Sequence, residues 1–297
     1  MTTLLEYVRE SGVRMAPWRV VADLREAERA AQDLGAPMWV RSTGNEHGFC
    51  MRVDHAGDLP LAYAKARQRG GAADALLLLQ QAADGAVCRV VGFQFDLTYV
   101  PIDAMEESYL EGFYRVPMML AAPSGLDAGA YAETMEAARK ATRTLPPAAG
   151  LLEMAFALDT RGPMLLEAYR RDATDPFHTR LLRLALGVDL EAEAARVAAG
   201  KPPIAAPMRD MAAVIRWITP SAGVVKAIEG ADAARAMPGV EEVTINIRPG
   251  DVIRHLTDTA ARDRIGWVIT VGPTRDIAHA CARDAVAAVR IVTQSVT

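Results

Sequence analysis

Two glutamates, Glu153 and Glu167, lie in a pair of apolar segments joined by a short turn, and this pattern constrains the fold more than any other part of the chain. The segments are Leu151–Leu158 and Pro163–Arg171, and the turn between them ends in glycine. Glycine can take the left-handed position of a three-residue hairpin loop. The sequence therefore predicts a β-hairpin with the loop Thr160–Gly162.

The faces of this hairpin follow from the alternation of side chains along a strand. With a three-residue loop, Asp159 pairs with Pro163 and Ala155 lies opposite Glu167. One face then carries Glu153, Ala155, Ala157, Leu165, Glu167 and Tyr169, and the core face carries Met154, Phe156, Leu158, Met164, Leu166 and Ala168. The alanines leave room above the carboxylates, which as diagonal neighbours lie about 7–8 Å apart at the backbone.

Two carboxylates at this separation raise each other's pKa unless a cation lies between them. Mg²⁺ is usually held by one or two carboxylates together with substrate phosphates, so Glu153 and Glu167 are candidate magnesium ligands. Two alternatives stay open. The glutamates could be exposed and paired with Arg161, Arg170 or Arg171, or a two-residue loop could place them on opposite faces of the hairpin.

Composition excludes several classes of function. The chain has 297 residues, about half of them apolar, and a formal charge of −4 with no basic tract, so neither a nucleic acid nor a membrane is an expected partner. The longest apolar stretches, such as Ala75–Leu79, are too short to span a bilayer, and the start lacks a signal-peptide pattern. Cys50, Cys88 and Cys281 are odd in number and far apart, which predicts reduced thiols in a cytoplasmic protein.

Familiar catalytic motifs are missing from the sequence. The five histidines are scattered without the spacing of zinc ligands, and there is no Gly-x-Ser-x-Gly elbow or Walker-type Gly-Lys-Ser/Thr. Helix and strand patterns instead predict an α+β protein in three parts. Residues 1–73 form a small α+β unit, residues 74–205 contain the glutamate hairpin, and residues 206–297 form a compact α+β cap that follows a proline-rich linker.

The order of these parts resembles the ATP-grasp superfamily of ATP-dependent ligases, in the branch with biotin carboxylase, the amino-acid ligases and carbamoyl phosphate synthetase. The resemblance rests on Ala36–Arg41 with its following loop, on Leu76–Gly85, and on the two glutamates. It implies two α+β subdomains that grip a nucleotide, with 1–73 as the lid, 74–205 as the core and 206–297 as the C-terminal domain.

The resemblance also implies roles for individual residues. Arg41 would clamp the nucleotide phosphates and Arg171 would contact the transferred group, and both would be catalytic. The implied ATP-binding residues are Arg41, Ser42, Gly44, Gly48, Gln80, Gln81, Ala82 and Ala83. Glu153 and Glu167 match the family's ligands for Mg²⁺, with Mn²⁺ as an alternative metal.

Three departures from the family pattern bear on function. Gln80 replaces an acidic residue. Tyr169 replaces an asparagine that helps to hold the metal in the family, and a protonated phenol is a weaker metal ligand than an amide oxygen. The family's N-terminal Rossmann-like domain has no counterpart ahead of Met1.

Two functions therefore remain. The first is an ATP- and Mg²⁺-dependent ligase that activates a carboxylate as an acyl phosphate for capture by an amine, with the N-terminal domain supplied by a partner chain or a dimer mate. The second is a catalytically degraded binding or scaffold subunit.

Overall fold

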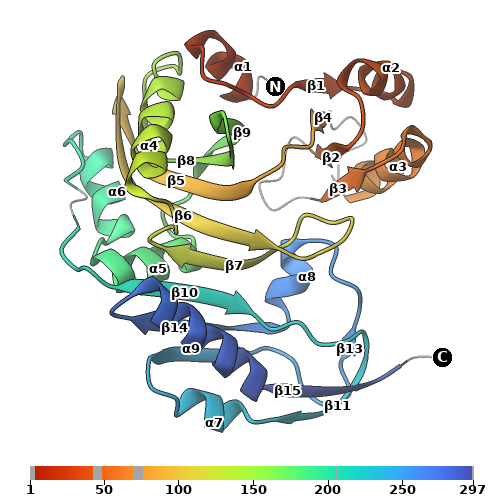
Figure 1. Ribbon diagram of the computed structural model, residues 1–297, viewed down its shortest axis with the longest axis vertical. Helices are drawn as coiled ribbons and strands as arrows, with labels where there is room; N and C mark the ends of the chain where they lie inside the picture. The colour runs from red at the N-terminus through yellow and green to blue at the C-terminus, as the bar shows by residue number, and fades with distance from the viewer. Residues whose placement is uncertain (1–3, 43–48, 70–75, 205–206, 296–297) are drawn as a thin grey trace.

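The computed structural model describes residues 4–42, 49–69, 76–204 and 207–295. It consists of a small sheet with two helices beside a large antiparallel sheet that runs through the middle of the molecule (Figure 1). The C-terminal elements lie at the opposite end of the large sheet from the small one. The predicted α+β class is confirmed.

The small sheet, called the lid sheet here, has the strand order β1-β4-β2-β3. Its strands are β1 Trp18–Val21, β2 Met38–Ser42, β3 Cys50–Val53 and β4 Leu77–Gln81. Helices α2 (Leu24–Leu34) and α3 (Leu59–Arg69) cover it and share a core of small and aliphatic side chains with it. Asp23 caps α2 by accepting a hydrogen bond from the backbone of Glu26, as an N-cap residue does.

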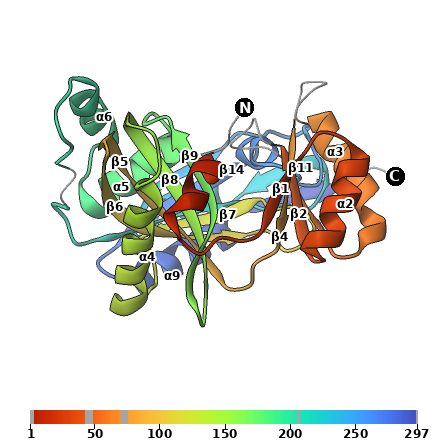
Figure 2. The same ribbon diagram turned by 90° about the horizontal axis from the view of Figure 1, so that it is seen from above.

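The large sheet, called the central sheet here, has the order β12-β14-β10-β7-β6-β5-β8-β9. Its strands are β5 Ala86–Asp96, β6 Thr98–Tyr109, β7 Pro117–Ala122, β8 Ala148–Asp159, β9 Gly162–Arg171, β10 Ala212–Trp217, β12 Val240–Ile245 and β14 Gly266–Gly272. Helices cover both faces (Figure 2). On one face lie α4 Ala128–Thr142 and α9 Arg275–Ala288, and on the other α5 Pro176–Leu186 and α6 Leu190–Ala198.

The remaining elements are short. A three-stranded sheet of order β13-β11-β15 closes the C-terminal end of the molecule. These elements are α1 Leu4–Val8, α7 Ala231–Arg235, α8 Thr259–Asp263, β11 Gly223–Glu229, β13 Val252–Ile253 and β15 Arg290–Gln294, with 3₁₀ turns at Arg9–Ser11 and Ala56–Asp58.

The three expected segments do not coincide with three separate sheets. β4 follows residue 73 in the chain, yet it pairs with β1 and β2 inside the lid sheet. β10, β12 and β14 follow residue 206, yet they extend the central sheet beyond β7. The C-terminal segment is therefore continuous with the core through backbone hydrogen bonds.

The glutamate hairpin forms as β8 and β9, but by a different route from the expected one. The loop has two residues, because Asp159 pairs with Gly162. A bulge between Ala155 and Phe156 then shifts the register by one residue and restores the expected pairing of Ala155 with Glu167. The two glutamates therefore share a face despite the shorter loop.

The bulge also exchanges the residues nearest the turn between the faces. Leu165 packs in the apolar cluster that contains Met154 and Phe156, whereas Met164 and Leu166 pack with Ala155 and Ala157. The expected faces were wrong for Leu165, Met164 and Leu166, because the sequence carries no mark of the bulge.

The lid sheet is fastened to the central sheet at two points. The loop between β6 and β7 bonds to β3, with Arg52 N donating to Phe113 O at 2.7 Å and Arg115 N donating to Cys50 O at 3.0 Å. The segment before β1 bonds to β9, where Ala16 N donates to Leu165 O at 3.0 Å. These bonds place β2 and its Arg41 above the glutamate hairpin.

The described helices contain none that is long and apolar enough to cross a membrane. The three cysteines are free thiols, and Cys50 and Cys88 are buried, in agreement with the expectation of reduced thiols.

Gly85 lies in the connection between β4 of the lid sheet and β5 of the central sheet. Its φ is +106°, and an added Cβ would lie 2.0 Å from the Leu158 carbonyl oxygen. We expect Gly85→Ala to lower the free energy of unfolding by at least about 2 kcal/mol more than Gly112→Ala. Gly112 also has a positive φ but has no atom within 4 Å of the added Cβ. Equal losses in urea unfolding of the two variants would contradict this account.

Candidate functional site

Glu153 lies at the centre of a buried polar cluster on the face of the central sheet that α5 covers. It is fully buried, and each of its oxygens contacts a cation. Arg171 binds it through two nitrogens, with Nε donating to Oε2 at 2.6 Å and Nη2 donating to Oε1 at 3.1 Å. Tyr169 donates its hydroxyl hydrogen to Oε1 at 2.7 Å, and His178 Nε2 lies 3.0 Å from Oε2.

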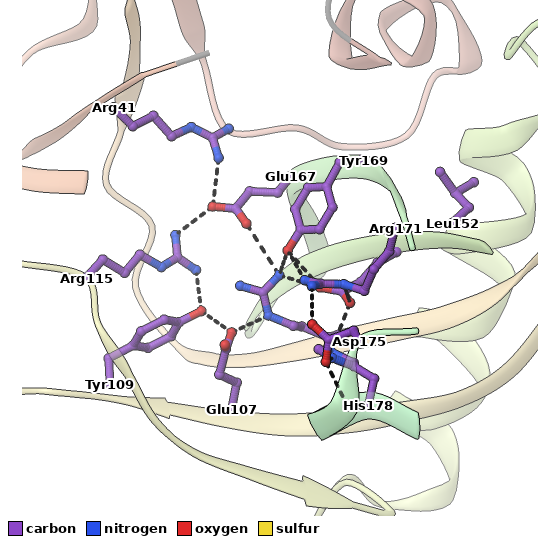
Figure 3. A network of polar contacts seen from close by, with 12 residues as sticks. Arg41, Glu107, Tyr109, Arg115, Leu152, Glu167, Tyr169, Arg171, Asp175 and His178 are labelled. Carbon is purple, nitrogen blue, oxygen red and sulfur yellow. Dashed lines mark hydrogen bonds and ion pairs between the residues drawn. The ribbon is translucent and has the colours of Figure 1, made fainter. Parts of the chain in front are cut away.

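Glu167 lies in the same cluster but faces the lid sheet. Arg41 on β2 reaches across to it, with 2.8 Å between Nη1 and Glu167 Oε1. Arg115, from the loop between β6 and β7, lies 3.7 Å from the same oxygen. Figure 3 shows Arg41 and Arg115 approaching Glu167 from two directions. Glu167 therefore links the lid sheet to the central sheet electrostatically.

Arg89, which no sequence pattern singled out, lies between the two glutamates. It comes from β5, where it pairs with Ala155 on the neighbouring strand. Its Nη1 donates to Glu153 Oε1 at 2.7 Å and lies 3.5 Å from Glu167 Oε2, and its Nε donates to Glu107. The space that the alanines leave above the hairpin is thus filled by a guanidinium group.

The cluster extends from Arg89 in two directions. On one side, Tyr109 donates to Glu107, and Arg115 Nη2 donates to the Tyr109 hydroxyl at 2.8 Å. On the other side, Asp175 caps α5 and accepts a hydrogen bond from Arg171 at 3.0 Å. The arginine–glutamate cluster, as named here, comprises Arg41, Arg89, Glu107, Tyr109, Arg115, Glu153, Glu167, Tyr169, Arg171, Asp175 and His178 (Figure 3).

The pKa values of the glutamates reflect this crowd of cations. Burial acts to raise the pKa of Glu153, but Arg171, His178 and Arg89 outweigh it and hold the pKa well below its usual range. Burial also acts to raise the pKa of Glu167, and Arg41, Arg115 and Arg89 together lower it to about 2. Both side chains are therefore ionised at neutral pH, as a metal or a guanidinium requires.

Two other groups of the cluster have shifted pKa values. Burial raises the pKa of Tyr169 well above its usual value, so the phenol keeps its proton at neutral pH. Burial and Arg171 act to lower the pKa of His178, but Glu153 and Asp175 outweigh them and raise it. His178 Nδ1 lies 2.9 Å from Asp175 Oδ1, which fixes the orientation of the ring.

The residues around Glu153 and Glu167 do not fit a magnesium ion as they stand. The bound ion requires oxygen ligands at about 2.0–2.1 Å in a near-octahedral arrangement. Here Arg89 occupies the space between the two carboxylates, and Tyr169 donates to Glu153 where a metal ligand would present a lone pair. Across the described residues no group of three or more His, Cys, Asp or Glu side chains is arranged to hold a metal.

A pocket of ≈ 300 Å³ lies between the lid sheet and the central sheet, next to this cluster. Trp39 on β2, Leu166 on β9, and the end of β4 line it, together with Tyr109 and Arg115. Arg115 belongs to both the pocket and the cluster, since it lines the pocket and also contacts Glu167. A pocket with Trp39 and Leu166 in its wall and with the guanidinium groups of Arg52 and Arg115 also lining it suits a flat ring that carries a negatively charged chain.

Three of the residues predicted to bind ATP lie at this pocket. Gln80, Gln81 and Ala83 line it. Gln80 is buried and donates its side-chain amide to Leu166 O at 2.8 Å, so it has a structural contact across the two sheets. The backbone N–H groups of Gln81 and Ala82 donate to Pro17 O and Pro37 O, each at 2.9 Å. Of these backbone groups, the Ala83 N–H is therefore the best placed donor for a ligand.

The structure describes only part of the other residues that were predicted to serve the nucleotide. Gly44 and Gly48 lie outside the described residues. Ser42 ends β2, is buried, and its hydroxyl has no hydrogen-bond partner in the described part of the chain. Arg41 and Arg171 both lie in the arginine–glutamate cluster, where they contact different glutamates.

Several members of the cluster could not be found from sequence. Arg89, Glu107, Tyr109 and Arg115 come from β5, β6 and the loop after β6, and only the strand order brings them beside the hairpin. One signal was available in the sequence. Asp175 is the N-cap of α5 and lies four residues after Arg171, and His178 lies one helical turn further on, so both side chains could be expected near Arg171.

Comparison with known proteins identifies the fold. Residues 216–294 match the family model described as L-amino acid ligase C-terminal domain 2. An uncharacterized protein of Sinorhizobium fredii, y4rH, is 31% identical over 165 residues, which are 55% of this chain. The match covers 34% of that protein, so this chain spans about a third of the length of its curated relative.

Solved structures match nearly the whole chain. The L-amino acid ligase of Bacillus licheniformis superposes with a TM-score of 0.81 at 15% identity, over 98% of this chain and 72% of that one. The N5-carboxyaminoimidazole synthase of Aspergillus clavatus, solved with ADP and 5-aminoimidazole ribonucleotide, gives 0.70 at 16% identity over 96% and 71%.

A third structure is the biotin carboxylase domain of 2-oxoglutarate carboxylase from Hydrogenobacter thermophilus, solved with MgADP, ADP and bicarbonate. It gives a TM-score of 0.69 at 18% identity over 97% of this chain and 65% of that one. These matches confirm the expected resemblance: the chain has the ATP-grasp fold.

The low pKa of Glu167 predicts how its contribution to stability depends on pH. The ionised carboxylate stabilises the fold above the unfolded pKa of 4.5, and this contribution is lost as the pH falls toward the folded pKa of about 2. We expect Glu167→Gln to cost about 2–5 kcal/mol at pH 7, because three arginines lose a partner. The cost should shrink between pH 4.5 and 3 in urea unfolding.

Glu28→Gln is the matched control, since Glu28 is exposed on α2. It should change the free energy of unfolding by less than about 0.5 kcal/mol at every pH. A cost for Glu167→Gln that stays constant down to pH 3 would contradict the proposed ion pairs.

Proposed function

We propose that this protein, which has the ATP-grasp fold, binds ATP between its two sheets and acts as an ATP-dependent ligase that joins a carboxylate to an amine. The observation that carries the proposal is the pocket between the lid sheet and the central sheet, which is lined by Arg115, an arginine that also approaches Glu167. The names of the matched structures, a ligase and two enzymes solved with ADP, support the nucleotide and the reaction class.

The proposed binding mode follows from the residues that line the pocket. The base would lie between Trp39 and Leu166, with its edge toward the backbone of Ala83. The phosphates would extend toward Arg115 and Arg41, since guanidinium groups bind phosphate oxygens through paired hydrogen bonds. The phosphates would repel Glu167 and compete with it for these two arginines. The side chains of Arg41 and Arg115 would therefore turn from Glu167 toward the nucleotide.

The proposed reaction has two steps. A carboxylate oxygen attacks the γ-phosphorus, and the bond to the β-phosphate oxygen breaks to release ADP. The amine then attacks the acyl carbon, and inorganic phosphate leaves. Arg41, Arg115 and Arg171 are the groups of this chain that are placed to hold the negative charge that moves in the first step.

The substrates proposed are a small carboxylate and an amine, with a partner chain or a second copy contributing to their binding. We place the activity in the cytoplasm, which the free thiols support.

A second candidate function is a nucleotide-binding subunit without catalysis. A specific observation favours it, because Arg89 and Tyr169 occupy the positions where the resemblance places the metal and its asparagine ligand. The two functions make the same prediction for ATP binding and different predictions for turnover.

Binding is tested with Arg115→Met. We expect this variant to weaken ATP binding about tenfold or more while adenosine binding changes less, since the arginine serves the phosphates. Isothermal titration calorimetry of both ligands measures this, and Arg254→Met, an exposed arginine, is the control. An equal loss for ATP and adenosine, with the fold intact by circular dichroism, would contradict the assigned phosphate position.

Turnover is tested by hydroxylamine trapping. The intact protein is incubated with ATP and a panel of amino acids and other small carboxylates, with and without added Mg²⁺. The ligase proposal predicts ADP and a hydroxamate with at least one carboxylate, and Arg171→Met should abolish both products. Tight ATP binding without ADP formation from any carboxylate would reject the ligase and leave the non-catalytic subunit.

A further inference from the structure

We propose that Arg89 takes the place of a divalent cation between Glu153 and Glu167, so that the protein free of ligand binds no metal ion there. The inference deepens the proposed function, since it concerns the same site, and it predicts that this site meets the phosphates with arginine side chains. It rests on the position of one guanidinium group, on the saturation of Glu153 and on the balance of charge.

The position of Arg89 is fixed by the sheet. β5 lies beside β8, and Arg89 pairs with Ala155, the residue that also lies opposite Glu167 on β9. Because Ala155 has no side chain beyond Cβ, the guanidinium group can lie across it between the two carboxylates. Its side chain is 8% exposed, and its ends contact Glu107 and Tyr169 as well, so the group is held on several sides.

Glu153 has little remaining capacity to bind a metal. A carboxylate offers about four lone-pair positions. Glu153 already contacts Arg89, Tyr169, two nitrogens of Arg171, and His178, all within 3.1 Å. A magnesium ion at this carboxylate would have to displace at least one charged hydrogen bond in a site from which water is excluded.

The charge of the cluster also disfavours a divalent ion. Four arginines, Arg41, Arg89, Arg115 and Arg171, face four carboxylates, Glu107, Glu153, Glu167 and Asp175. The charges therefore cancel when His178 is neutral, and the cluster is positive when His178 is protonated. A cluster without excess negative charge repays little of the cost of dehydrating Mg²⁺.

The same arrangement suits a phosphate chain. Arg115 lines the pocket, and Arg41 contacts the same Glu167 oxygen that Arg115 approaches. Each of these two arginines has only Glu167 as its carboxylate partner among the described residues. An incoming triphosphate would replace Glu167 as the anionic partner of these two arginines. The contacts of Arg89 with Glu107 and Glu153 would stay unchanged when Arg41 and Arg115 turn toward the phosphates.

The test titrates the intact protein with Mn²⁺ in the absence of nucleotide. Electron paramagnetic resonance measures the concentration of free Mn²⁺, and the bound fraction follows from it. Wild type should leave the free Mn²⁺ signal unchanged. Arg89→Met removes the charge between the carboxylates, and we expect Mn²⁺ to bind at least about tenfold more tightly than to wild type. Adding Glu167→Gln to Arg89→Met should abolish this gain, and Arg254→Met should behave as wild type.

The wild-type protein decides the inference even if Arg89→Met fails to fold. Stoichiometric Mn²⁺ binding by wild type that is lost in Glu167→Gln would overturn it, and so would a folded Arg89→Met that binds no more Mn²⁺ than wild type. Because no nucleotide is present, the result is independent of whether the protein binds ATP or turns it over.

Discussion

The contact of Arg89 with Glu153 and Glu167 is the interaction on which the polar interior of this protein depends. Two ionised carboxylates can share a buried face only if a cation compensates them, and here the cation comes from the adjacent strand of the same sheet. The rest of the cluster is arranged around this contact. Arg171 and His178 complete the shell of Glu153, and Arg41 and Arg115 complete that of Glu167.

The cluster also connects the two halves of the molecule. Glu167 belongs to the central sheet, while Arg41 belongs to the lid sheet, so their ion pair adds a charged contact to the backbone bonds that fasten one sheet to the other. The pocket lies at this junction, with Arg115 in its wall. A ligand with phosphate groups would compete with Glu167 for these arginines, and binding would therefore be coupled to the contact between the sheets.

The sequence was sufficient to predict the fold and the shared face of Glu153 and Glu167, because alternation and the order of elements survive at low identity. The hairpin loop length predicted from the sequence was wrong. Glu153 and Glu167 nevertheless share a face, because a bulge between Ala155 and Phe156 shifts the register by one residue. Arg89 could not be predicted, since its partners lie 18, 64 and 78 residues away and meet it only through strand pairing. Gly44 and Gly48 lie outside the described residues, so their expected roles in ATP binding stay predictions.

The most direct test of the central claim is a crystal structure grown with MnCl₂ and without nucleotide, with anomalous scattering measured at the manganese edge. The account predicts the guanidinium group of Arg89 between Glu153 and Glu167, and no anomalous peak within ligand distance of both carboxylates. A manganese peak that bridges the two glutamates, with Arg89 turned away from them, would contradict it.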